Sequence, residues 1–295
     1  MNVLVTGGTG FVGTHLCAEL AARGHDVTAL ARSPDDTGLP DGVTTAVGDV
    51  TDYASIEGAF EGQDVVVNLV ALSPLFKPKG GTSHERVHLG GTENVVKAAK
   101  AHGVPKLVQQ SALGADPNGP TAYIRAKGSA EQVVKDSGLD WVIFRPSVIF
   151  GDGGEFISFT KSLTTPVVTA LPGANSAKFQ PIWIDDFTPM LADAVEDDAH
   201  VGQIYEIGGP EVLTLGDVTR LIYRAKGKSV TVVPVPMALA TLGMTMAGPL
   251  PFVPFGPDQA RSLRFDNTTS QNDISAFGVS ERELTTLETY LSENQ

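Results

Sequence analysis

Short apolar runs alternate with segments of helical periodicity through the first half of the chain. The runs are rich in valine, leucine and alanine, which is typical of strands buried on both faces of a sheet. The predicted strands span residues 3–5, 26–31, 43–47, 65–71, 106–110 and 139–145. The predicted helices span residues 11–23, a segment from about residue 53, residues 83–102 and a segment around residues 123–127. This alternation predicts an α/β fold with a doubly wound, mostly parallel sheet.

The pattern is looser after Gly151. Strands are predicted at residues 179–184 and 203–207, the first followed by a helix that Asp185 and Asp186 cap and that runs to about Val195. A further helix begins at Thr214, with an apolar face typical of a surface helix. We expect the second half to form a small lobe over the ends of the strands, leaving a cleft for a substrate.

A glycine turn joins the first strand to the first helix. Glycine at position 7 allows a sharp turn off the strand, and Gly10 has no Cβ, so a pyrophosphate can approach the backbone. Gly13 lets the helix lie close to the sheet. Free N–H groups at the helix start would then face the phosphates. The sequence Thr6-Gly7-Gly8-Thr9-Gly10-Phe11-Val12-Gly13 therefore predicts a dinucleotide-binding turn.

The second strand ends at Arg32 and Ser33, where the choice of cofactor is made. An acidic residue there selects NAD through the ribose hydroxyls, whereas an arginine pairs with the 2′-phosphate of NADP. Arg32 therefore favours NADP(H) over NAD(H). The alternative is that Arg32 is a solvated loop residue and that Asp35 or Asp36 lies nearer the ribose.

The ends of the third and fourth strands are expected to line the same cofactor. Asp49 and Val50 follow the third strand and would hold the adenine; alternatively, Asp49 or Thr51 simply caps the next helix. Val70 and Ala71 end the fourth strand, and ligands bind outside the carboxyl ends of such strands.

Tyr123 and Lys127 are four residues apart and so share one face of a predicted helix. A neighbouring ammonium lowers the pKa of a phenol, which would make Tyr123 a usable acid or base nearer neutral pH. Ser111 ends the preceding strand and would orient a substrate oxygen. His84, His88 and His102 lie in the helix at 83–102 without a matching set of Cys, Asp or Glu, so we expect no metal site.

The net charge and the cysteine content of the chain disfavour some classes of function. The formal charge of −13 disfavours nucleic-acid binding and also suits a protein that works in concentrated salt. Cys17 is the single cysteine and is expected to be a buried thiol. No signal-peptide pattern precedes the first strand, so we expect a cytoplasmic protein, with peripheral membrane association as the alternative.

Residues 229–257 carry no charge and contain six prolines. Only residues 237–248 have a helical pattern, which is too short to span a membrane. The simplest interpretation is a helix packed on the lobe. The alternative is that residues 237–257 form an apolar patch for a lipophilic substrate, a membrane surface or a protein partner.

The chain resembles the short-chain dehydrogenase/reductase superfamily, on its extended and atypical side. The glycine turn, Gly48-Asp49-Val50, Tyr123 to Lys127 and Arg145-Pro146-Ser147 carry this resemblance. Val87-His88, residues 111–116 and Trp183-Ile184-Asp185-Asp186 are most similar to proteins related to the 39 kDa accessory subunit of respiratory complex I.

The resemblance implies an NAD(P)-binding fold with Tyr123 and Lys127 as the acid/base pair and Ser111 as the accompanying hydroxyl. It implies a dinucleotide-binding domain at 1–150, to which 179–200 cross back, and a smaller lobe at 151–178 and 201–295. The expected cofactor-binding residues are Gly7, Thr9, Gly10, Phe11, Val12, Gly13, Arg32, Ser33, Asp49, Val50, Val70, Ala71, Lys127 and Pro146.

Three functions are compatible with these residues. The first is an NADP(H)-dependent oxidoreductase that acts on a small carbonyl or apolar substrate. The second is a cofactor-binding subunit or assembly factor without turnover, and the third is a sugar-nucleotide epimerase or dehydratase. The sequence leaves the oligomeric state open.

Overall fold

The computed structural model describes residues 1–34, 38–76, 78, 80–175, 177–235, 261 and 265–294. They divide into two compact units. Unit 1 comprises Met1–Leu72, Gly80–Arg145 and Ile184–Tyr205, and unit 2 comprises Ser73–Lys79, Pro146–Trp183 and Glu206–Gln295. The apolar segment predicted at 237–257, and the alternative ribose ligands Asp35 and Asp36, lie outside the described residues.

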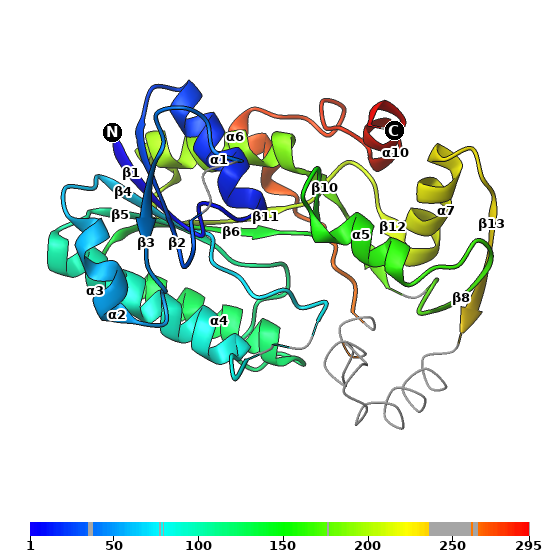
Figure 1. Ribbon diagram of the computed structural model, residues 1–295, viewed down its shortest axis with the longest axis horizontal. Coiled ribbons are helices and arrows are strands. Elements are labelled where there is room, and N and C mark those ends of the chain that lie inside the picture. Colours follow the sequence, from blue (N-terminus) through cyan, green and yellow to red (C-terminus); the bar gives the residue numbers. More distant parts are fainter. Residues whose placement is uncertain are drawn as a thin grey trace. The chain divides into compact units, whose positions relative to one another are not determined.

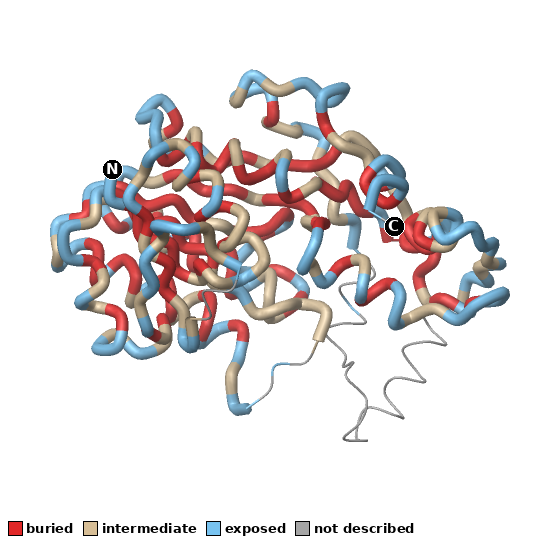
Figure 2. The backbone as a smooth tube through the Cα atoms, turned by 45° about the horizontal axis from the view of Figure 1, so that its top comes forward, coloured by how far each residue is buried: buried red, intermediate tan, exposed pale blue. Residues whose placement is uncertain are grey.

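Unit 1 is organised around a seven-stranded sheet with the order β11-β6-β5-β4-β1-β2-β3 (Figure 1). Its strands are β1 (Asn2–Thr6), β2 (Asp26–Ala31), β3 (Thr44–Val47), β4 (Val65–Asn68), β5 (Lys106–Gln110), β6 (Asp140–Pro146) and β11 (Gln203–Ile207). The central strand β1 pairs in parallel with both β2 and β4. The strands are largely buried, as the red tube in Figure 2 shows, because helices cover both faces. The predicted doubly wound sheet is confirmed.

The helices lie in two layers. Figure 1 shows α1 (Phe11–Ala22) and α6 (Ile184–Glu196) on one face, and α2 (Tyr53–Ile56), α3 (Gly91–His102) and α4 (Ala122–Lys135) on the other. The second layer encloses a core in which Leu4, Val66 and Leu107 of the strands pack with Val95 and Val134 of the helices. Apolar side chains on one stripe of each helix therefore close the sheet on that side.

A cluster of ion pairs holds α6 beside α1, although about 170 residues separate them in sequence. The Arg23 guanidinium donates to Asp193 at 2.6 Å and to Glu196 at 2.8 Å, and His25 contacts Glu196 at 2.8 Å. Segment 184–205 thus belongs to unit 1 by direct contact. Cys17 of α1 is buried, as predicted, and burial raises the pKa of its thiol to about 12.

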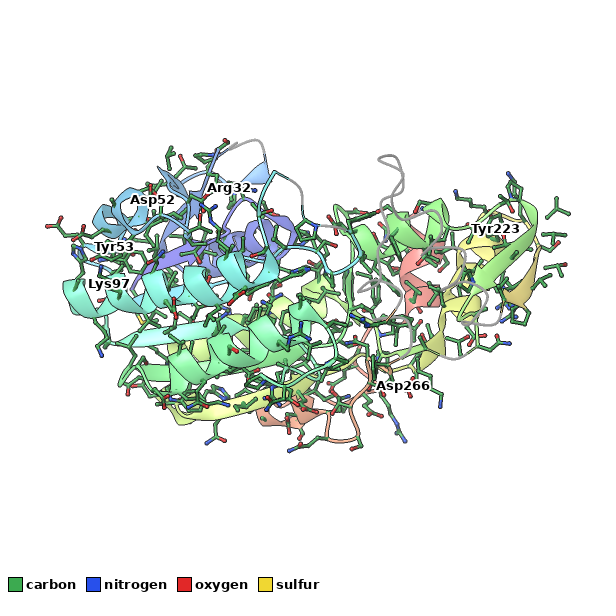
Figure 3. The ribbon with its side chains drawn as sticks, turned by 90° about the horizontal axis from the view of Figure 1, so that it is seen from below. Arg32, Asp52, Tyr53, Lys97, Tyr223 and Asp266 are labelled. Carbon is green, nitrogen blue, oxygen red and sulfur yellow. The ribbon has the colours of Figure 1, made fainter. Side chains whose placement is uncertain are left out.

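Three local predictions are corrected. Strand β4 ends at Asn68 rather than at residue 71. The helix predicted at 83–102 begins with a π-helical turn, η3 (Glu85–Gly90), before α3. Helix α2 is capped by Asp52, which accepts from the Ala54 N–H, and not by Asp49 or Thr51. Figure 3 shows Asp52 beside Tyr53, whose ring centroid lies 3.8 Å from the Lys97 ammonium.

Unit 2 contains three two-stranded sheets and three α-helices among its described residues. The strands pair as β7 (Ile149–Phe150) with β10 (Ile182–Trp183), β8 (Val167–Pro172) with β13 (Val230–Val235), and β9 (Lys178–Phe179) with β12 (Leu213–Thr214). The helices are α5 (Glu155–Ser162), α7 (Leu215–Ala225) and α10 (Leu287–Glu293). They pack around a core that includes Phe150, Phe156, Val218 and Leu287.

The strand predicted at 179–184 is therefore two short strands with different partners, β9 and β10. Helix α7 begins, as predicted, after Thr214, which forms a capping box with Asp217. In the part of the chain that the structure describes, no helix has the length and apolar character needed to cross a bilayer.

Candidate active site

The glycine turn lies between β1 and α1 and is tied to the neighbouring strand. The N–H groups of Gly7 and Gly8 both donate to the Leu30 carbonyl of β2, at 2.8 and 3.3 Å. Gly7 has φ +78°, a conformation that glycine adopts at little cost. Gly10 precedes the first residue of α1, and no side chain caps this helix end. The first N–H groups of α1 are therefore left for another acceptor.

The space around each glycine shows what its missing side chain permits. A Cβ on Gly10 would have only the Gly7 carbonyl oxygen within 4 Å, at 3.2 Å, so the space beside this residue is open. A Cβ on Gly13 would lie 2.2 Å from the same oxygen. The close approach to the sheet belongs instead to Gly8, whose Cβ would lie 2.6 Å from that of Ala29 in β2. Gly13 therefore allows the helix to approach the turn itself, and Gly8 allows the turn to approach the sheet.

The fit of this turn to a dinucleotide can be judged from these atoms. The uncapped start of α1 supplies N–H donors, and the open space beside Gly10 leaves room for a phosphate group next to them. Thr9, Phe11 and Val12 are each half-buried, so their side chains do not close this space completely. The residues present fit a pyrophosphate.

The end of β4 lies against the turn. A Cβ on Gly7 would be 3.3 Å from the Val70 nitrogen, so the backbone at Val70 is a direct neighbour of the glycine turn. Val70 is half-buried and Ala71 is exposed. Both follow the last strand residue, as expected for residues that line a ligand outside the strand ends.

Arg32 and Ser33 come immediately after β2, and both are exposed. Figure 3 shows the Arg32 side chain at the surface. Within the described residues its guanidinium has no ion-pair or hydrogen-bond partner. Because the Gly7 N–H donates to Leu30, near the end of β2, Arg32 lies only a few residues along the strand from the point that contacts the turn.

Asp49 and Val50 follow β3 and have local roles. The Asp49 carboxylate accepts from the Thr51 N–H at 2.9 Å and so shapes the loop. The Val50 side chain is buried in the core, and its carbonyl accepts from Asn94 of α3 at 2.8 Å. Asp49 is half-buried, so a ligand can reach it, whereas the Val50 side chain is already packed.

A chain of buried polar side chains crosses the carboxyl ends of three strands. The Thr6 hydroxyl of β1 donates to Asn68 of β4 at 2.7 Å, and the Asn68 amide donates to Gln109 of β5 at 2.9 Å and to Thr92 of α3 at 3.3 Å. These bonds satisfy groups that would otherwise be costly to bury. They fix the strand ends that carry the site. The sequence signal was a polar residue at the end of each apolar run, which the motif search did not use.

Tyr123 is the second residue of α4, whose first turn is capped by Thr121. Its ring contacts two histidines edge-on: the ring centroids lie 5.5 Å from that of His84 and 5.3 Å from that of His88. The two imidazoles are stacked, 5.6 Å apart and 10° from parallel. His84 immediately precedes the π-helical turn η3 and His88 lies on it, so the turn brings the two rings together beside α4. The sequence predicted no metal site at these histidines, and His88 entered only as part of the family resemblance, so their contact with Tyr123 was not predicted.

The environment makes Tyr123 an acid rather than a phenolate. Burial raises the pKa of Tyr123 above its usual range, contrary to the lowering expected from the nearby ammonium. His88 is 2 % exposed, and burial, with the charges of Lys127 and His84, lowers its pKa to about 2. The His88 Nε2 accepts from the Leu72 N–H at 3.4 Å, so the proton of this neutral ring is assigned to Nδ1.

Lys127 lies one turn after Tyr123 and is 1 % exposed. Its Nζ donates to the Gln110 carbonyl at the end of β5, at 2.9 Å. Burial lowers the pKa of Lys127 to about 8, although the Glu131 carboxylate opposes this shift. The ammonium is thus charged at neutral pH and is close to losing its proton.

Glu131 continues the same helical face and is a buried carboxylate that the sequence reading missed. It accepts from the Ser111 hydroxyl at 2.6 Å and from the Arg145 guanidinium at 2.7 and 2.8 Å. Ser111, expected to orient a substrate, therefore already donates its proton within the protein. The sequence signal for Glu131 was its spacing: residues 123, 127 and 131 recur at intervals of four and therefore share one face of the helix. Pro146, the last residue of β6, is buried and belongs to unit 2.

Comparison with known proteins places this chain in a family. The model of a family described as NAD(P)H-binding matches residues 7–177, more than half of the chain. The chain belongs to this NAD(P)H-binding family. The match begins in the glycine turn and extends beyond Tyr123 and Lys127 into unit 2.

Individual relatives agree with this placement. The chain is 28 % identical over 293 residues to the mitochondrial NADH dehydrogenase [ubiquinone] 1 alpha subcomplex subunit 9 of Arabidopsis thaliana, covering 92 % of this chain and 71 % of that protein. It is 29 % identical over 258 residues to a 3 beta-hydroxysteroid dehydrogenase/Delta 5→4-isomerase of Mycobacterium tuberculosis, covering 77 % and 70 %. The resemblance to atypical short-chain dehydrogenases and to a complex I subunit is confirmed.

A solved structure has the same fold. The UDP-glucose 4-epimerase of Thermus thermophilus, in complex with NAD, superposes with a TM-score of 0.71 at 23 % identity and covers 99 % of this chain and 97 % of that one. At this identity the likeness concerns the fold alone.

Proposed function

We propose that this protein is an NADP(H)-dependent reductase of a small, apolar carbonyl compound, with Tyr123 as the proton donor. The observation that carries the proposal is the environment of Tyr123. The phenol is protonated at neutral pH, burial raises its pKa further, and the charged Lys127 lies one turn away on the same helical face. A proton donor beside a cation is suited to reduction, in which the substrate oxygen gains negative charge.

Each residue has a separate task in this reaction. The N–H groups at the start of α1 bind the pyrophosphate of the cofactor, which supplies the hydride when bound. Tyr123 then transfers its proton to the substrate oxygen. Lys127 stabilises the phenolate that is left, while the Gln110 carbonyl holds the ammonium in place. His88 is neutral and so adds no charge that would compete with Lys127.

The proposal is tested with Tyr123→Phe in NADPH-dependent reduction of a panel of aliphatic and aromatic ketones. We expect turnover to fall by about 100-fold or more, because general acid catalysis is lost. The affinity for NADPH should stay within about twofold. Tyr53→Phe, on the short helix α2, is the matched control and should retain turnover. Equal activity of Tyr123→Phe and wild type would refute the role of the phenol.

The preference for NADPH rests on Arg32, which is exposed at the end of β2 and has no partner within the described residues. A guanidinium can pair with the 2′-phosphate of NADPH, whereas NADH offers it no phosphate. Arg32→Gln should weaken NADPH binding by about tenfold or more and leave NADH binding unchanged. Arg282→Gln removes an exposed arginine of unit 2 and controls for net charge. Tighter binding of NADH than of NADPH by the wild type would contradict this assignment.

A second candidate is a cofactor-binding subunit without turnover. Two observations favour it: Ser111 donates its proton to Glu131, and Lys127 donates to the Gln110 carbonyl, so both polar groups have partners inside the protein. One relative is a subunit of NADH dehydrogenase by name. Normal NADPH affinity with no reduction of any carbonyl in the panel would support this candidate and exclude the reductase.

A further inference from the structure

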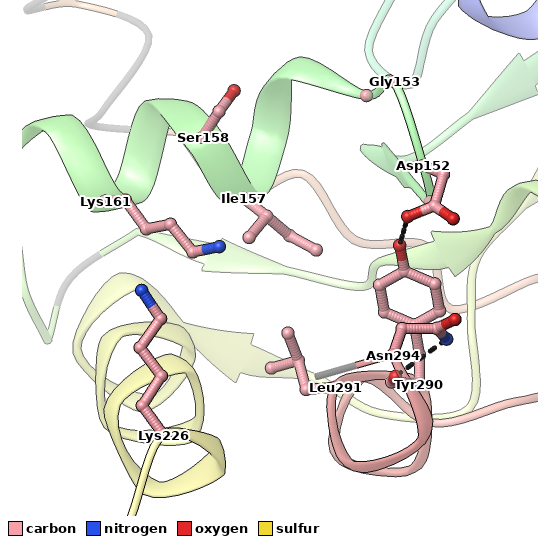
Figure 4. Close-up of a pocket in the computed structure, with 11 residues that line it drawn as sticks. Asp152, Gly153, Ile157, Ser158, Lys161, Lys226, Tyr290, Leu291 and Asn294 are labelled. Carbon is pink, nitrogen blue, oxygen red and sulfur yellow. Dashed lines mark hydrogen bonds between the residues drawn. The ribbon is translucent and has the colours of Figure 1, made fainter. Parts of the chain in front are cut away.

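Unit 2 contains a pocket of about 500 Å³ that the proposed reaction does not use. It is lined by the glycine-rich loop 151–154, by α5, by the residue that follows α7 and by α10 (Figure 4). All four segments belong to unit 2.

Two lysines enter this pocket from different helices. Figure 4 shows Lys161 of α5 and Lys226 at the end of α7 extending into the same space. Among the described residues, neither ammonium has a hydrogen-bond or ion-pair partner. Burial and the charge of Lys226 lower the pKa of Lys161. Two like charges without a counter-ion in a chain with 34 acidic and 21 basic residues indicate a place for an anion.

The helix dipoles account for only part of this arrangement. Lys161 lies in the last turn of α5 and Lys226 is the C-cap of α7, and a cation at a helix C-terminus is stabilising. That effect explains one lysine on each helix. It does not explain why the two side chains line one pocket, where their mutual repulsion is unfavourable unless an anion lies between them.

Apart from Asp152, the rest of the lining is neutral or apolar. Ile157 and Leu291 enter from α5 and α10, and the hydroxyl of Tyr290 donates to Asp152 at 2.7 Å. Asp152 is the one carboxylate among the lining residues, and it is held by this bond. The lining thus combines a cationic side with an apolar side, which fits a small organic anion.

We infer that this pocket binds a phosphate monoester, with its dianion between Lys161 and Lys226 and its organic group against Ile157 and Leu291. A phosphate monoester carries a charge of about −1.5 to −2 at neutral pH and therefore balances two ammonium groups, as a carboxylate does not. Lysine binds phosphate as a point charge and requires no fixed geometry, which suits two flexible side chains. The inference is independent of the proposed reaction.

The test is calorimetric titration with hexyl phosphate in the presence of saturating NADH, which occupies the glycine turn of unit 1 and, unlike NADPH, carries no phosphate monoester. We expect a dissociation constant of about 1 mM or below. The double variant Lys161→Gln/Lys226→Gln should weaken binding by about tenfold or more, because both charges are removed. Lys178→Gln/Lys228→Gln removes two other exposed lysines of unit 2 and should bind like the wild type. All four lysines are exposed, so both variants are expected to fold.

Three results would overturn the inference. They are the absence of hexyl phosphate binding by the wild type, an equal loss in the two double variants, and hexanoate binding as tightly as hexyl phosphate. Binding of inorganic phosphate as tight as that of hexyl phosphate would remove the organic group from the assignment and refute it in this form. The assay does not measure turnover, so its outcome is separate from that of the Tyr123→Phe test.

Discussion

The two halves of the candidate site in unit 1 are built in different ways. The cofactor end is a backbone structure: the glycine turn presents uncapped N–H groups and open space beside Gly10. The face of α4 is a side-chain structure in which Lys127 and Glu131 are almost completely buried and bonded to neighbours from other elements.

Because of this difference, some properties of the site depend on residues that are close in sequence and others on residues that are distant in sequence. The turn depends on residues within ten positions of each other and on β2 and the end of β4 beside them. The surroundings of Tyr123 include His84, which precedes η3, and His88 of η3, and those of Lys127 include β5 and the next turn of α4. Burial, which no short motif encodes, reversed the expected shift in the Tyr123 pKa.

The largest predicted effect separates two glycines of the turn. In Gly13→Ala the new Cβ would meet the Gly7 carbonyl oxygen at 2.2 Å, so the helix start must move. We expect the free energy of unfolding to fall by about 2 kcal/mol and NADPH affinity to fall by about 100-fold. Chemical denaturation and calorimetry would measure the two quantities.

Gly10→Ala is the matched variant, since its Cβ would meet only that oxygen, at 3.2 Å. Its free energy of unfolding should stay within about 1 kcal/mol of wild type, while its NADPH affinity falls by about tenfold or more. If both variants lost stability equally and kept their affinity, the turn would be a structural corner and not a cofactor site.

The second-largest predicted effect tests the burial of His88, which contacts Tyr123 of α4. His88 stays neutral in the folded protein down to pH about 2, whereas in the unfolded chain it is protonated near pH 6.5. The unfolded state therefore binds more protons between these values, and stability is lost as the pH falls. Below pH 6, His88 alone should lower the free energy of unfolding by about 1.4 kcal/mol per pH unit.

His88→Gln removes this titration, so the difference in unfolding free energy between wild type and variant should change with that slope from about pH 6 to about pH 4.5. Denaturant titrations at several pH values would measure it. Parallel curves for the two proteins would mean that water reaches the imidazole in the folded state.

The smallest effect concerns the coupling along α4. Because the pKa of Lys127 is about 8, any turnover that needs the ammonium should decline above that pH. The Glu131 carboxylate raises the pKa of Lys127, so Glu131→Gln should move this limb of the pH–rate profile to lower pH. Glu93→Gln, an exposed carboxylate of α3, is the control. If the alkaline limb of the pH–rate profile had the same pKa in Glu131→Gln as in the wild type, Glu131 would have no influence on Lys127.

Much of the fold could be predicted because its signals are local. The apolar runs gave the strands of unit 1, with β2 at the predicted bounds, and the glycine motif gave the turn. The end of β4 was misassigned for a reason that is not local. β4 ends at Asn68, whose side chain bonds to Thr6 and Gln109 of the neighbouring strands, although the residues that follow it are apolar.

The sequence by itself determined the α/β architecture of unit 1, the glycine turn between β1 and α1, and the placing of Tyr123 and Lys127 on one helical face. These follow from periodicities of two and four residues and from the conformational freedom of glycine. Only the tertiary structure decided that burial raises the pKa of Tyr123, that Ser111 donates to Glu131 and that Lys161 and Lys226 share one pocket. The physical reason is that pKa values and hydrogen-bond partners depend on desolvation and on groups distant in sequence, which only folding brings together.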